Sequence, residues 1–381
     1  MKRDLILVAI ALCTWGFGEG MFILFQPLYL EELGADPLMI GVIISGIGIA
    51  MTFSHIPAGY LADKIGRRPM LRAAWLLGTS AALTMAISNS LPTFIIGSTI
   101  YASTAFVISP LNSYITAARG KMGVGRVLTL ISAAYNIGAI GGPIIGGWIG
   151  EQFGLRYNFL IAAIFFIIST AIIFNIAPQP VERQVTAKSG ALNRHIFSKR
   201  YISYLLLVFF VMFSLYLPQP LSQNYVQNER NLDLSNIGYL ISARSLGVVI
   251  LNLMIGSLNS TLGIIISQLS VSLFTVFIYL GGSMPFYLIG YLLMGGYQTA
   301  RSLTSAQARS LVDAPIMGIS YGIVEAVNST AIIVAPLLAG VLYTYNPDSI
   351  YWVGFILIII TILITIAFSP IKISLQKNAM D

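Results

Sequence analysis

Four charged residues stand inside long apolar stretches of this 381-residue chain, namely Glu19, Arg244, Arg301 and Glu325. A carboxyl group in apolar surroundings holds its proton more tightly and can exchange it near neutral pH. An arginine in the same surroundings attracts an anion or pairs with a carboxylate. If these stretches cross a bilayer, each charge is costly unless it is solvated or paired, and each therefore marks a candidate functional site.

The overall composition indicates that the apolar stretches do cross a membrane. Hydrophobic residues make up 56% of the chain and charged residues only 9%, whereas soluble domains carry roughly 25% charged residues. Glycine (35 residues) and proline (16 residues) are abundant, as is usual in membrane helices. The single cysteine, Cys13, supports neither a disulfide framework nor a Cys-rich metal site. We therefore expect a polytopic membrane protein and exclude a soluble enzyme.

Twelve apolar runs are long enough to span a bilayer as helices, which requires about 20 residues each. They are residues 5–30, 39–61, 70–89, 92–117, 126–149, 156–177, 202–226, 235–258, 262–281, 285–309, 317–343 and 350–369. One long link separates the first six runs from the last six. We expect an all-α fold of 12 transmembrane helices, with a six-helix bundle at 1–177, a cytoplasmic linker at 178–201, and a second six-helix bundle with a short cytoplasmic tail at 202–381.

The lysines and arginines predict the orientation of these runs. With the N-terminus inside, seventeen of the 21 Lys and Arg residues fall in cytoplasmic segments, and only Arg156 and Arg230 fall in outside segments. Such an excess is typical of cytoplasmic loops. We therefore expect both termini in the cytoplasm and a multi-pass protein of the plasma membrane. The net charge of +7 reflects this topology, so we expect no nucleic-acid partner.

The two halves of the chain resemble each other. Residues 40–66 align without gaps on 237–263, and Gly41 and Gly238 are among the identical pairs. A second match aligns the fifth run with the eleventh, pairing Gly142-Pro143 and Gly146-Gly147 with Ala335-Pro336 and Ala339-Gly340. We infer a parallel repeat of two six-helix bundles, which is the plan of many secondary transporters.

Polar and aromatic residues recur on single faces of several runs, at steps of three and four residues. The first run carries Glu19 about 21 Å along its axis, close to the middle of the membrane. We expect these faces to line a common polar cavity; the alternative is that the polar groups only hold helices together. The candidates for substrate contact are Trp15, Phe22, Gln26, Tyr29, Asn112, Tyr135, Asn136, Tyr216, Gln219, Gln223, Gln298, Tyr321 and Asn328.

The segment after the second run reads Gly-Tyr-Leu-Ala-Asp-Lys-Ile-Gly-Arg-Arg-Pro-Met-Leu from Gly59 to Leu71. It resembles the signature loop of the major facilitator superfamily, G-x-L-a-D-r-x-G-r-k-x-x-l, with every fixed position filled. The resemblance covers essentially the whole chain and implies two pseudo-symmetric bundles with a cytoplasmic latch between them. Its gating residues would be Gly59, Asp63, Gly66, Arg67 and Arg68. A basic loop that only sets topology would explain the arginines, but not the acid between two spaced glycines.

The fifth run carries Gly138, Gly142, Pro143, Gly146 and Gly147. This pattern is similar to the antiporter motif of the same family, which is associated with exporters, although Thr129 replaces its first glycine. A glycine at every fourth position also makes a smooth stripe that another helix can approach closely. That packing role alone is the alternative reading. The fourth run lacks the arginine that drug antiporters of the family usually place there.

Two of the four intramembrane charges lie at one depth. Arg301 is eight residues from the cytoplasmic end of the tenth run, and Glu325 is eight residues from the cytoplasmic end of the eleventh, about 12 Å in each case. We predict that they face each other within reach of a direct or water-bridged contact, and that proton or substrate binding breaks the pair. The alternatives are a static structural pair, or two side chains on different faces.

Together these patterns predict a secondary active transporter that moves a small molecule by alternating access. We favour proton-coupled efflux of an amphipathic or drug-like compound, with Glu19, Glu325, Arg301 and Arg244 as candidates for proton coupling. A porter for a sugar, organic acid or other metabolite is the alternative, and a non-transporting receptor is a minor one. Because the chain has no phosphate-binding loop, zinc-ligand pair or nucleophile elbow, we expect no enzyme, cofactor or metal. The expected partners are the substrate, a proton and the lipid bilayer, around a monomer.

Overall fold

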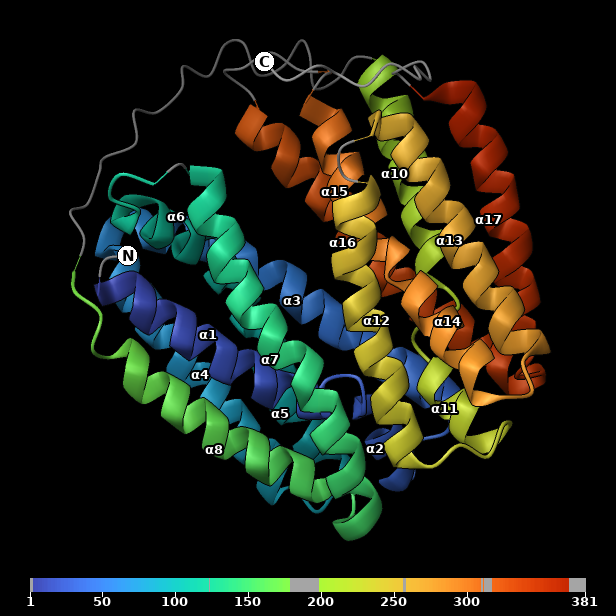
Figure 1. Ribbon diagram of the computed structural model, residues 1–381, viewed down its shortest axis with the longest axis horizontal. Helices are drawn as coiled ribbons and strands as arrows, with labels where there is room; N and C mark the ends of the chain where they lie inside the picture. Colours follow the sequence, from blue (N-terminus) through green and yellow to red (C-terminus); the bar gives the residue numbers. More distant parts are fainter. Residues whose placement is uncertain are drawn as a thin grey trace. The chain divides into compact units, whose positions relative to one another are not determined.

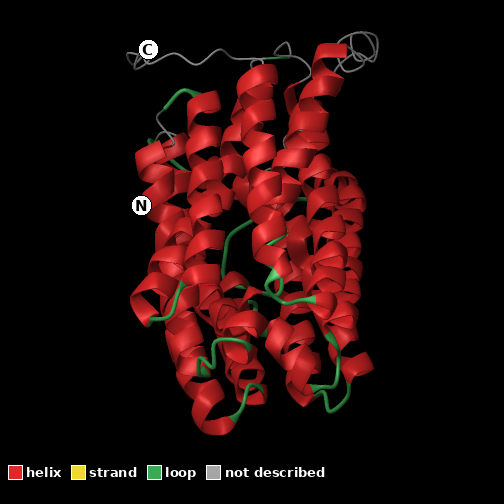
Figure 2. Cartoon of the chain, turned by 90° about the vertical axis from the view of Figure 1, so that its right-hand side faces the viewer, coloured by secondary structure: helices red, strands yellow, loops and turns green. Residues whose placement is uncertain are grey.

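The computed structural model describes residues 3–122, 124–178, 199–255, 258–309, 311 and 317–369. At 55–65, 109, 124–126, 128–129, 309 and 317–322 it describes the backbone alone. In these parts of the chain all regular structure is helical, and short loops join the helices (Figure 2).

The helices of the first half of the chain follow the predicted runs. They are α1 (Arg3–Phe22), α2 (Gln26–Glu32), α3 (Pro37–Ile65), α4 (Arg67–Ile87), α5 (Leu91–Ser103), a 3₁₀ turn (Thr104–Val107), α6 (Ile108–Ala118), α7 (Val124–Phe153) and α8 (Arg156–Ile173). Those of the second half are α10 (Lys199–Tyr216), α11 (Ser222–Asn228), α12 (Leu234–Ile255), α13 (Ser260–Leu280), α14 (Met284–Met294), α15 (Gly296–Arg309), α16 (Met317–Tyr345) and α17 (Ser349–Phe368). The fold is that of a polytopic α-helical membrane protein.

Eleven helical stretches in the described residues are long and apolar enough to cross a membrane. The predicted tenth run is missing from this set because it divides at Gly295 into α14 and α15, which are both short. Three other runs that the sequence predicts as continuous are also interrupted. The first divides between α1 and α2, the fourth contains the 3₁₀ turn, and the seventh divides between α10 and α11.

These interruptions occur in the first and fourth runs of each half. Two of them carry the same tripeptide, Gln26-Pro27-Leu28 and Gln219-Pro220-Leu221, and proline cannot donate the backbone hydrogen bond that a continuous helix needs. Inside a membrane, irregular backbone is tolerated only where protein buries it or where it lines a water-filled space. The four interrupted runs are therefore the elements on which a polar site is to be sought.

The described residues form two compact units. Unit 1 holds the residues up to Asp36, those from 46 to 178, and Leu232–Ser242; unit 2 holds Pro37–Ser45, the residues from 199 to Asn231, and those from Ala243 onward. The first residues of α3 thus pack within unit 2, and the first residues of α12 pack within unit 1. The predicted boundary at 178–201 falls mostly outside the described residues.

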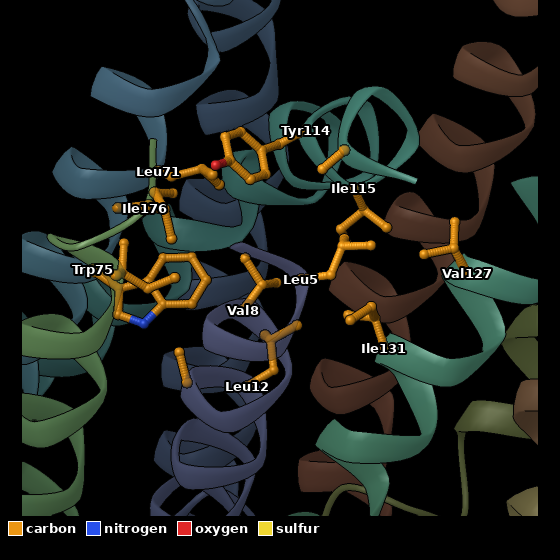
Figure 3. Close-up of a cluster of buried hydrophobic side chains, with 14 residues drawn as sticks. Leu5, Val8, Leu12, Leu71, Trp75, Tyr114, Ile115, Val127, Ile131 and Ile176 are labelled. Carbon is orange, nitrogen blue, oxygen red and sulfur yellow. The ribbon is translucent and has the colours of Figure 1, made fainter. Parts of the chain in front are cut away.

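The core of unit 1 forms around α1, which lies between α7 and α8 (Figure 1). Figure 3 shows its buried apolar cluster, in which Leu5 and Val8 of α1 meet Trp75 of α4 and Ile131 of α7. The indole nitrogen of Trp75 donates a hydrogen bond of 2.8 Å to the hydroxyl of Ser169 on α8. This packing fixes the position of α1 and hence of the side chains further along it.

Unit 2 is built around α10 and α13, with α16 and α17 packed against α10 and with α14, α15 and α17 packed against α13. Its interior includes a small polar network, in which Gln268 donates to the hydroxyl of Thr361 at 3.1 Å. The opposite face of α17 exposes large apolar side chains, among them Ile356, Ile360 and Leu363. Such a face suits contact with lipid tails.

Each unit contains one copy of the same helix–helix contact, and the two copies involve residues that the sequence repeat aligns with each other. A Cβ added at Gly238 of α12 would meet the carbonyl oxygen of Pro143 on α7 and would lie 3.1 Å from the Cα of Gly147. A Cβ added at Gly41 of α3 would meet the carbonyl oxygen of Pro336 on α16 and would lie 3.3 Å from the Cα of Gly340. Both crossings depend on glycine because the backbones touch.

Candidate functional site

The predicted glycine stripe on α7 is the surface that receives α1. A Cβ at Gly138 would lie 2.6 Å from the backbone nitrogen of Phe17 and closer still to the carbonyl oxygen of Cys13. A Cβ at Gly146 would lie 2.6 Å from the carbonyl oxygen of Met21, and Gly142 lies equally close to α1 at Phe17. The prediction that this stripe admits a neighbouring helix is confirmed. Gly147, one residue away, faces α12 instead, while Pro143 contacts both helices, with its ring beside Gly20 of α1 and its carbonyl oxygen beside Gly238 of α12.

Glu19 lies on the part of α1 that this stripe holds. The hydroxyl of Tyr135 on α7 donates a hydrogen bond of 2.9 Å to Glu19 Oε2, and Tyr101 on α5 is a second hydrogen-bond partner. Sequence reasoning named Glu19 and Tyr135 separately but missed Tyr101, which carries no charge or motif that would mark it. Among the described residues, the partners of this carboxyl group are therefore two phenols.

Stacked aromatic rings surround the part of α1 that precedes this carboxyl group. Trp15, one turn before Glu19, stacks on Phe166 of α8 with ring centroids 3.9 Å apart, and Tyr101 stacks on the same phenylalanine at 5.8 Å. Trp15 also fills the space beside Gly78 of α4, where a Cβ would overlap its ring. The acidic group of Glu19 therefore lies one turn from a group of stacked aromatic rings.

The rest of the predicted α1–α2 face is packed into unit 1. Phe22 and Tyr29 are 1% and 5% exposed, and both contact Phe159 of α8, with centroid distances of 5.3 Å and 4.9 Å. Gln26, at the interruption between α1 and α2, is 9% exposed, and its Nε2 has no hydrogen-bond partner in the described residues. Packing accounts for the two aromatic residues, and their contact with substrate stays a prediction.

The second group of charges lies in unit 2 and contains the predicted pair. Arg301 of α15 forms a salt bridge with Glu325 Oε1 of α16, so the predicted contact is confirmed. Asn328, one turn further along α16, donates a hydrogen bond of 3.0 Å from Nδ2 to Glu325 Oε2. Both oxygens of the carboxylate are therefore engaged. The side chains of Arg301 and Glu325 are 27% and 44% exposed, so water or a solute can reach the pair.

Two tyrosines and a further arginine surround the pair. Tyr216, the last residue of α10, and Tyr297, the second residue of α15, place their rings 5.4 Å apart. The Tyr297 hydroxyl interacts electrostatically with Arg301, Glu325 and Arg244 of α12. Sequence reasoning missed Tyr297, although its position four residues before Arg301 on one helical face could have indicated it. We call Tyr216, Arg244, Tyr297, Arg301, Glu325 and Asn328 the unit 2 cluster.

The remaining predicted contacts are distributed over several helices. Gln219 and Gln223, at the interruption of the seventh run, are 4% and 2% exposed, and Gln219 Nε2 donates to the carbonyl of Leu215 at 2.6 Å. Asn136 donates to the carbonyl of Ser132 at 2.8 Å.

Asn112 of α6 is exposed and Gln298 of α15 is partly buried, while the side chain of Tyr321 lies outside the described part. No group of three His, Cys, Asp or Glu suited to a metal occurs among the side chains that the structure describes.

The predicted gating segment lies at the junction of α3 and α4. Gly66 has φ +91°, a conformation that favours glycine, and it is the single residue between the two helices. Arg67 and Arg68 follow in the first turn of α4. Gly59 and Asp63 lie in α3, where the structure describes the backbone alone. Their part in gating stays a prediction.

Comparison with known proteins relates this arrangement to a family. The sequence model of the Major Facilitator Superfamily matches residues 8–221 and, a second time, residues 204–379. An uncharacterized MFS-type transporter of Methanocaldococcus jannaschii is 27% identical over 160 residues, and the match covers 42% of each chain. The multi-drug resistance efflux pump PmrA of Streptococcus pneumoniae is 27% identical over 325 residues, which is 80% of each chain.

The fold is likewise shared with solved structures. The crystal structure of a mutant of the nucleoside transporter NupG superposes with a TM-score of 0.82 at 15% identity, covering 96% of this chain and 100% of the other. These relatives and neighbours are transporters and not enzymes. Because the family model matches both halves, the chain belongs to the Major Facilitator Superfamily and is a multi-pass membrane transporter of small molecules.

Proposed function

We propose that this transporter exports an amphipathic or drug-like compound in exchange for protons, with Glu19 as the proton carrier. The observation that carries the proposal is the carboxyl group of Glu19 in the last turn of α1, whose hydrogen-bond partners among the described residues are two tyrosine hydroxyls. A carboxyl group in such a place is more easily neutralised by a proton than by a salt bridge. Glu325, which is paired with Arg301, is the second candidate.

Two further features support export of an aromatic or apolar compound. The stripe of Gly138, Gly142 and Gly146 belongs to a pattern similar to the motif that is associated with exporters, with Thr129 in place of its first glycine, and it packs against the helix that carries Glu19. A relative aligned over 80% of this chain bears the name of a multi-drug efflux pump. The aromatic residues beside Glu19 suit a compound with a large apolar body.

The proposal includes the membrane arrangement. The excess of Lys and Arg in alternate loops supports a plasma-membrane protein with both termini in the cytoplasm. The cytoplasmic segment would then contain Gly59, Asp63, Gly66, Arg67 and Arg68, which would control opening on that side. In this view the bundles are 1–177 and 202–381, joined by 178–201, and a monomer is sufficient for transport.

A porter for a polar metabolite is the second candidate. It is favoured by the unit 2 cluster, where an accessible ion pair lies beside amide and hydroxyl groups that can bind a polar solute. Transport measured with compounds of both kinds distinguishes the two functions.

The test is transport by purified protein in proteoliposomes with an acidic interior. Proton-coupled exchange predicts that ethidium or carboxyfluorescein accumulates inside and that nigericin, which collapses the pH gradient, abolishes the accumulation. The Glu19→Gln variant, which imitates the protonated acid, should lose accumulation but keep exchange of internal for external probe. Tyr239→Phe, which changes an exposed residue of α12, serves as the control. Accumulation that survives Glu19→Gln would refute the role of Glu19.

A further inference from the structure

We propose that Tyr114 and Gln307 are positioning residues that fasten two half-helices, α6 and α15, to the ends of α8 and α17. The half-helix α6 completes the predicted fourth run, and α15 completes the tenth. Each then moves with the helix end that it holds, and not with the first half of its own run. The inference concerns movement within each unit and does not depend on the compound, the direction or the coupling ion proposed above.

The first observation is a group of three hydrogen-bonded side chains in unit 2, which we call the unit 2 clamp. Gln307, in the last turn of α15, is almost completely buried. Its Nε2 donates hydrogen bonds of 2.8 Å to the hydroxyl of Thr261 at the start of α13 and of 2.8 Å to that of Ser369, directly after α17. The two hydroxyls also bond to each other at 2.6 Å. One amide group therefore fastens three helix ends together.

The second observation is a corresponding group in unit 1, which we call the unit 1 clamp. The hydroxyl of the buried Tyr114 on α6 donates a hydrogen bond of 2.8 Å to the carbonyl of Ala177. The backbone N–H of Ala177 donates to Asp4 Oδ1 of α1 at 3.2 Å. Arg72 of α4 donates to the carbonyl of Phe174, and its guanidinium lies 4.8 Å from the centre of that ring. Three helices thus hold the residues that follow α8.

The two clamps occupy equivalent places in the sequence repeat. A shift of 193 residues places Tyr114 on Gln307 and Ile176 on Ser369. In unit 1 the acceptor is Ala177, one residue further along. A phenol and an amide therefore make the same connection, although they share nothing but a hydrogen-bond donor. This agreement is expected if the connection itself serves both units.

Each half-helix is joined to the rest of its run at an irregular place. The backbone N–H of Gln298 donates to the carbonyl of Gly295, and that of Gly295 donates to the carbonyl of Leu292, so both bonds span three residues and not four. In the fourth run the corresponding place is the 3₁₀ turn Thr104–Val107. Turns of this kind inside a helix often mark a hinge. The clamps are therefore needed to keep the half-helices in place.

The unit 2 clamp acts on the ion pair through α15. Arg301 lies six residues before Gln307, about 9 Å along the same helix, and forms the salt bridge with Glu325 of α16. A tilt of α15 that opened the clamp would also carry the guanidinium away from Glu325. Gln307 therefore positions Arg301 without contacting the pair.

The experiment is hydrogen–deuterium exchange of the full-length protein in lipid nanodiscs, followed by mass spectrometry of peptides from α14 and α15. Thr261→Val keeps the shape of the side chain and removes its hydroxyl, whereas Thr261→Ser keeps the hydroxyl. Gln307→Leu and Ser369→Ala remove the other two members of the clamp. The matched control is Ser302→Ala, because Ser302 is an exposed residue of α15 whose hydroxyl donates to Gln298 of the same helix.

We expect exchange in α15 to become about 3- to 10-fold faster in Thr261→Val, Gln307→Leu and Ser369→Ala, as the loss of one or two buried hydrogen bonds implies. Exchange in α14 should stay unchanged, and Thr261→Ser and the control should behave as the wild type. Unchanged exchange in α15, or an equal increase in α14, would overturn the proposal. If Gln307→Leu does not fold, Thr261→Val and Ser369→Ala decide.

Unit 1 provides an independent measurement. Tyr114→Phe removes the hydroxyl that bonds to Ala177 and should accelerate exchange in α6 but not in α5. Tyr157→Phe, at an exposed position of α8, is its matched control. Equal acceleration in α5 and α6, or none in α6, would contradict the equivalence of the two clamps.

The positioning of Arg301 is tested by combining two changes. If Gln307 acts on the ion pair through α15, the effects of Gln307→Leu and Glu325→Gln on exchange in α15 should not add, because each loosens what the other holds. Thr261→Val combined with Glu325→Gln should give the same result. Additive effects would show that the clamp is a separate structural support, and would overturn the positioning role.

Discussion

The contact between α1 and α7 predicts a specific cost for a single methyl group. In Gly138→Ala the new Cβ would lie 2.6 Å from the backbone nitrogen of Phe17 and closer to the carbonyl oxygen of Cys13, whereas ordinary contacts begin at 3.4 Å. Both opposing atoms belong to backbone, which cannot rotate away, so the two helices must separate by a substantial part of an ångström. Overpacking of this kind costs about 1–3 kcal/mol.

That cost translates into a measurable loss of thermal stability. One kcal/mol lowers Tm by about 2–4 °C in a domain of 150–250 residues, so we expect Gly138→Ala to lower Tm by roughly 2–12 °C in a thermal unfolding assay in detergent. Gly46→Ala is the matched control, because a Cβ at Gly46 meets nothing within 4 Å, and alanine is the better helix former by about 1 kcal/mol. Equal stability of the two variants would refute the reasoning. Because α1 carries Glu19, transport should fall in Gly138→Ala and stay normal in Gly46→Ala.

Three further outcomes follow from specific contacts of the site and its supports. Tyr135→Phe removes a hydrogen bond to Glu19, so the pH dependence of transport should change if Glu19 carries the proton; an unchanged pH profile would contradict this. Arg301→Glu and Glu325→Arg should each lower the yield of monodisperse protein in size-exclusion chromatography, and the double variant should restore it. Because the pair is partly exposed, each single change should lower the free energy of unfolding by less than the roughly 3–5 kcal/mol of a fully buried pair. Glu151 Oε2 accepts a hydrogen bond of 2.8 Å from the backbone N–H of Leu234 at the start of α12. Glu151→Gln weakens this acceptor and should lower Tm by about one or two degrees at low salt, and high salt should remove the difference.

Much of the fold follows from residues that can be counted. Apolar length predicts the spans, and the equal depth of Arg301 and Glu325 predicts their contact, because charges in a membrane must find partners. The spacing of Gly138, Gly142 and Gly146 predicts the approach of α1 for an equally simple steric reason. In each case a single large free-energy cost, that of an unpaired charge in a membrane or of overlapping backbones, leaves few possible arrangements.

The features that escaped prediction depend on several weak preferences at once. The interruption at Gly295 looks like an ordinary position in an apolar run, and there the backbone of α12 lies against the chain, whereas Pro27 is a local signal that the sequence reasoning passed over. Phe22 and Tyr29 share a face with Glu19, but α8 covers them with Phe159. A helical face tells which side chains point the same way, and does not tell which neighbour covers them.

The sequence repeat allows the surroundings of Glu19 in unit 1 to be compared with those of Glu325 in unit 2. A shift of 193 residues places Pro143 on Pro336 and Gln26 on Gln219, and the same shift places Tyr135 on Asn328. In unit 1 Tyr135 donates to Glu19 of α1, and in unit 2 Asn328 donates to Glu325 of its own helix. The equivalent position therefore supplies the hydrogen bond to the acid in both units, although the acid has moved to a different helix. With Met212 at the position equivalent to Glu19, the acid of the unit 2 cluster stands on α16 and pairs with Arg301, whereas Glu19 of unit 1 stands on α1 and accepts from Tyr135.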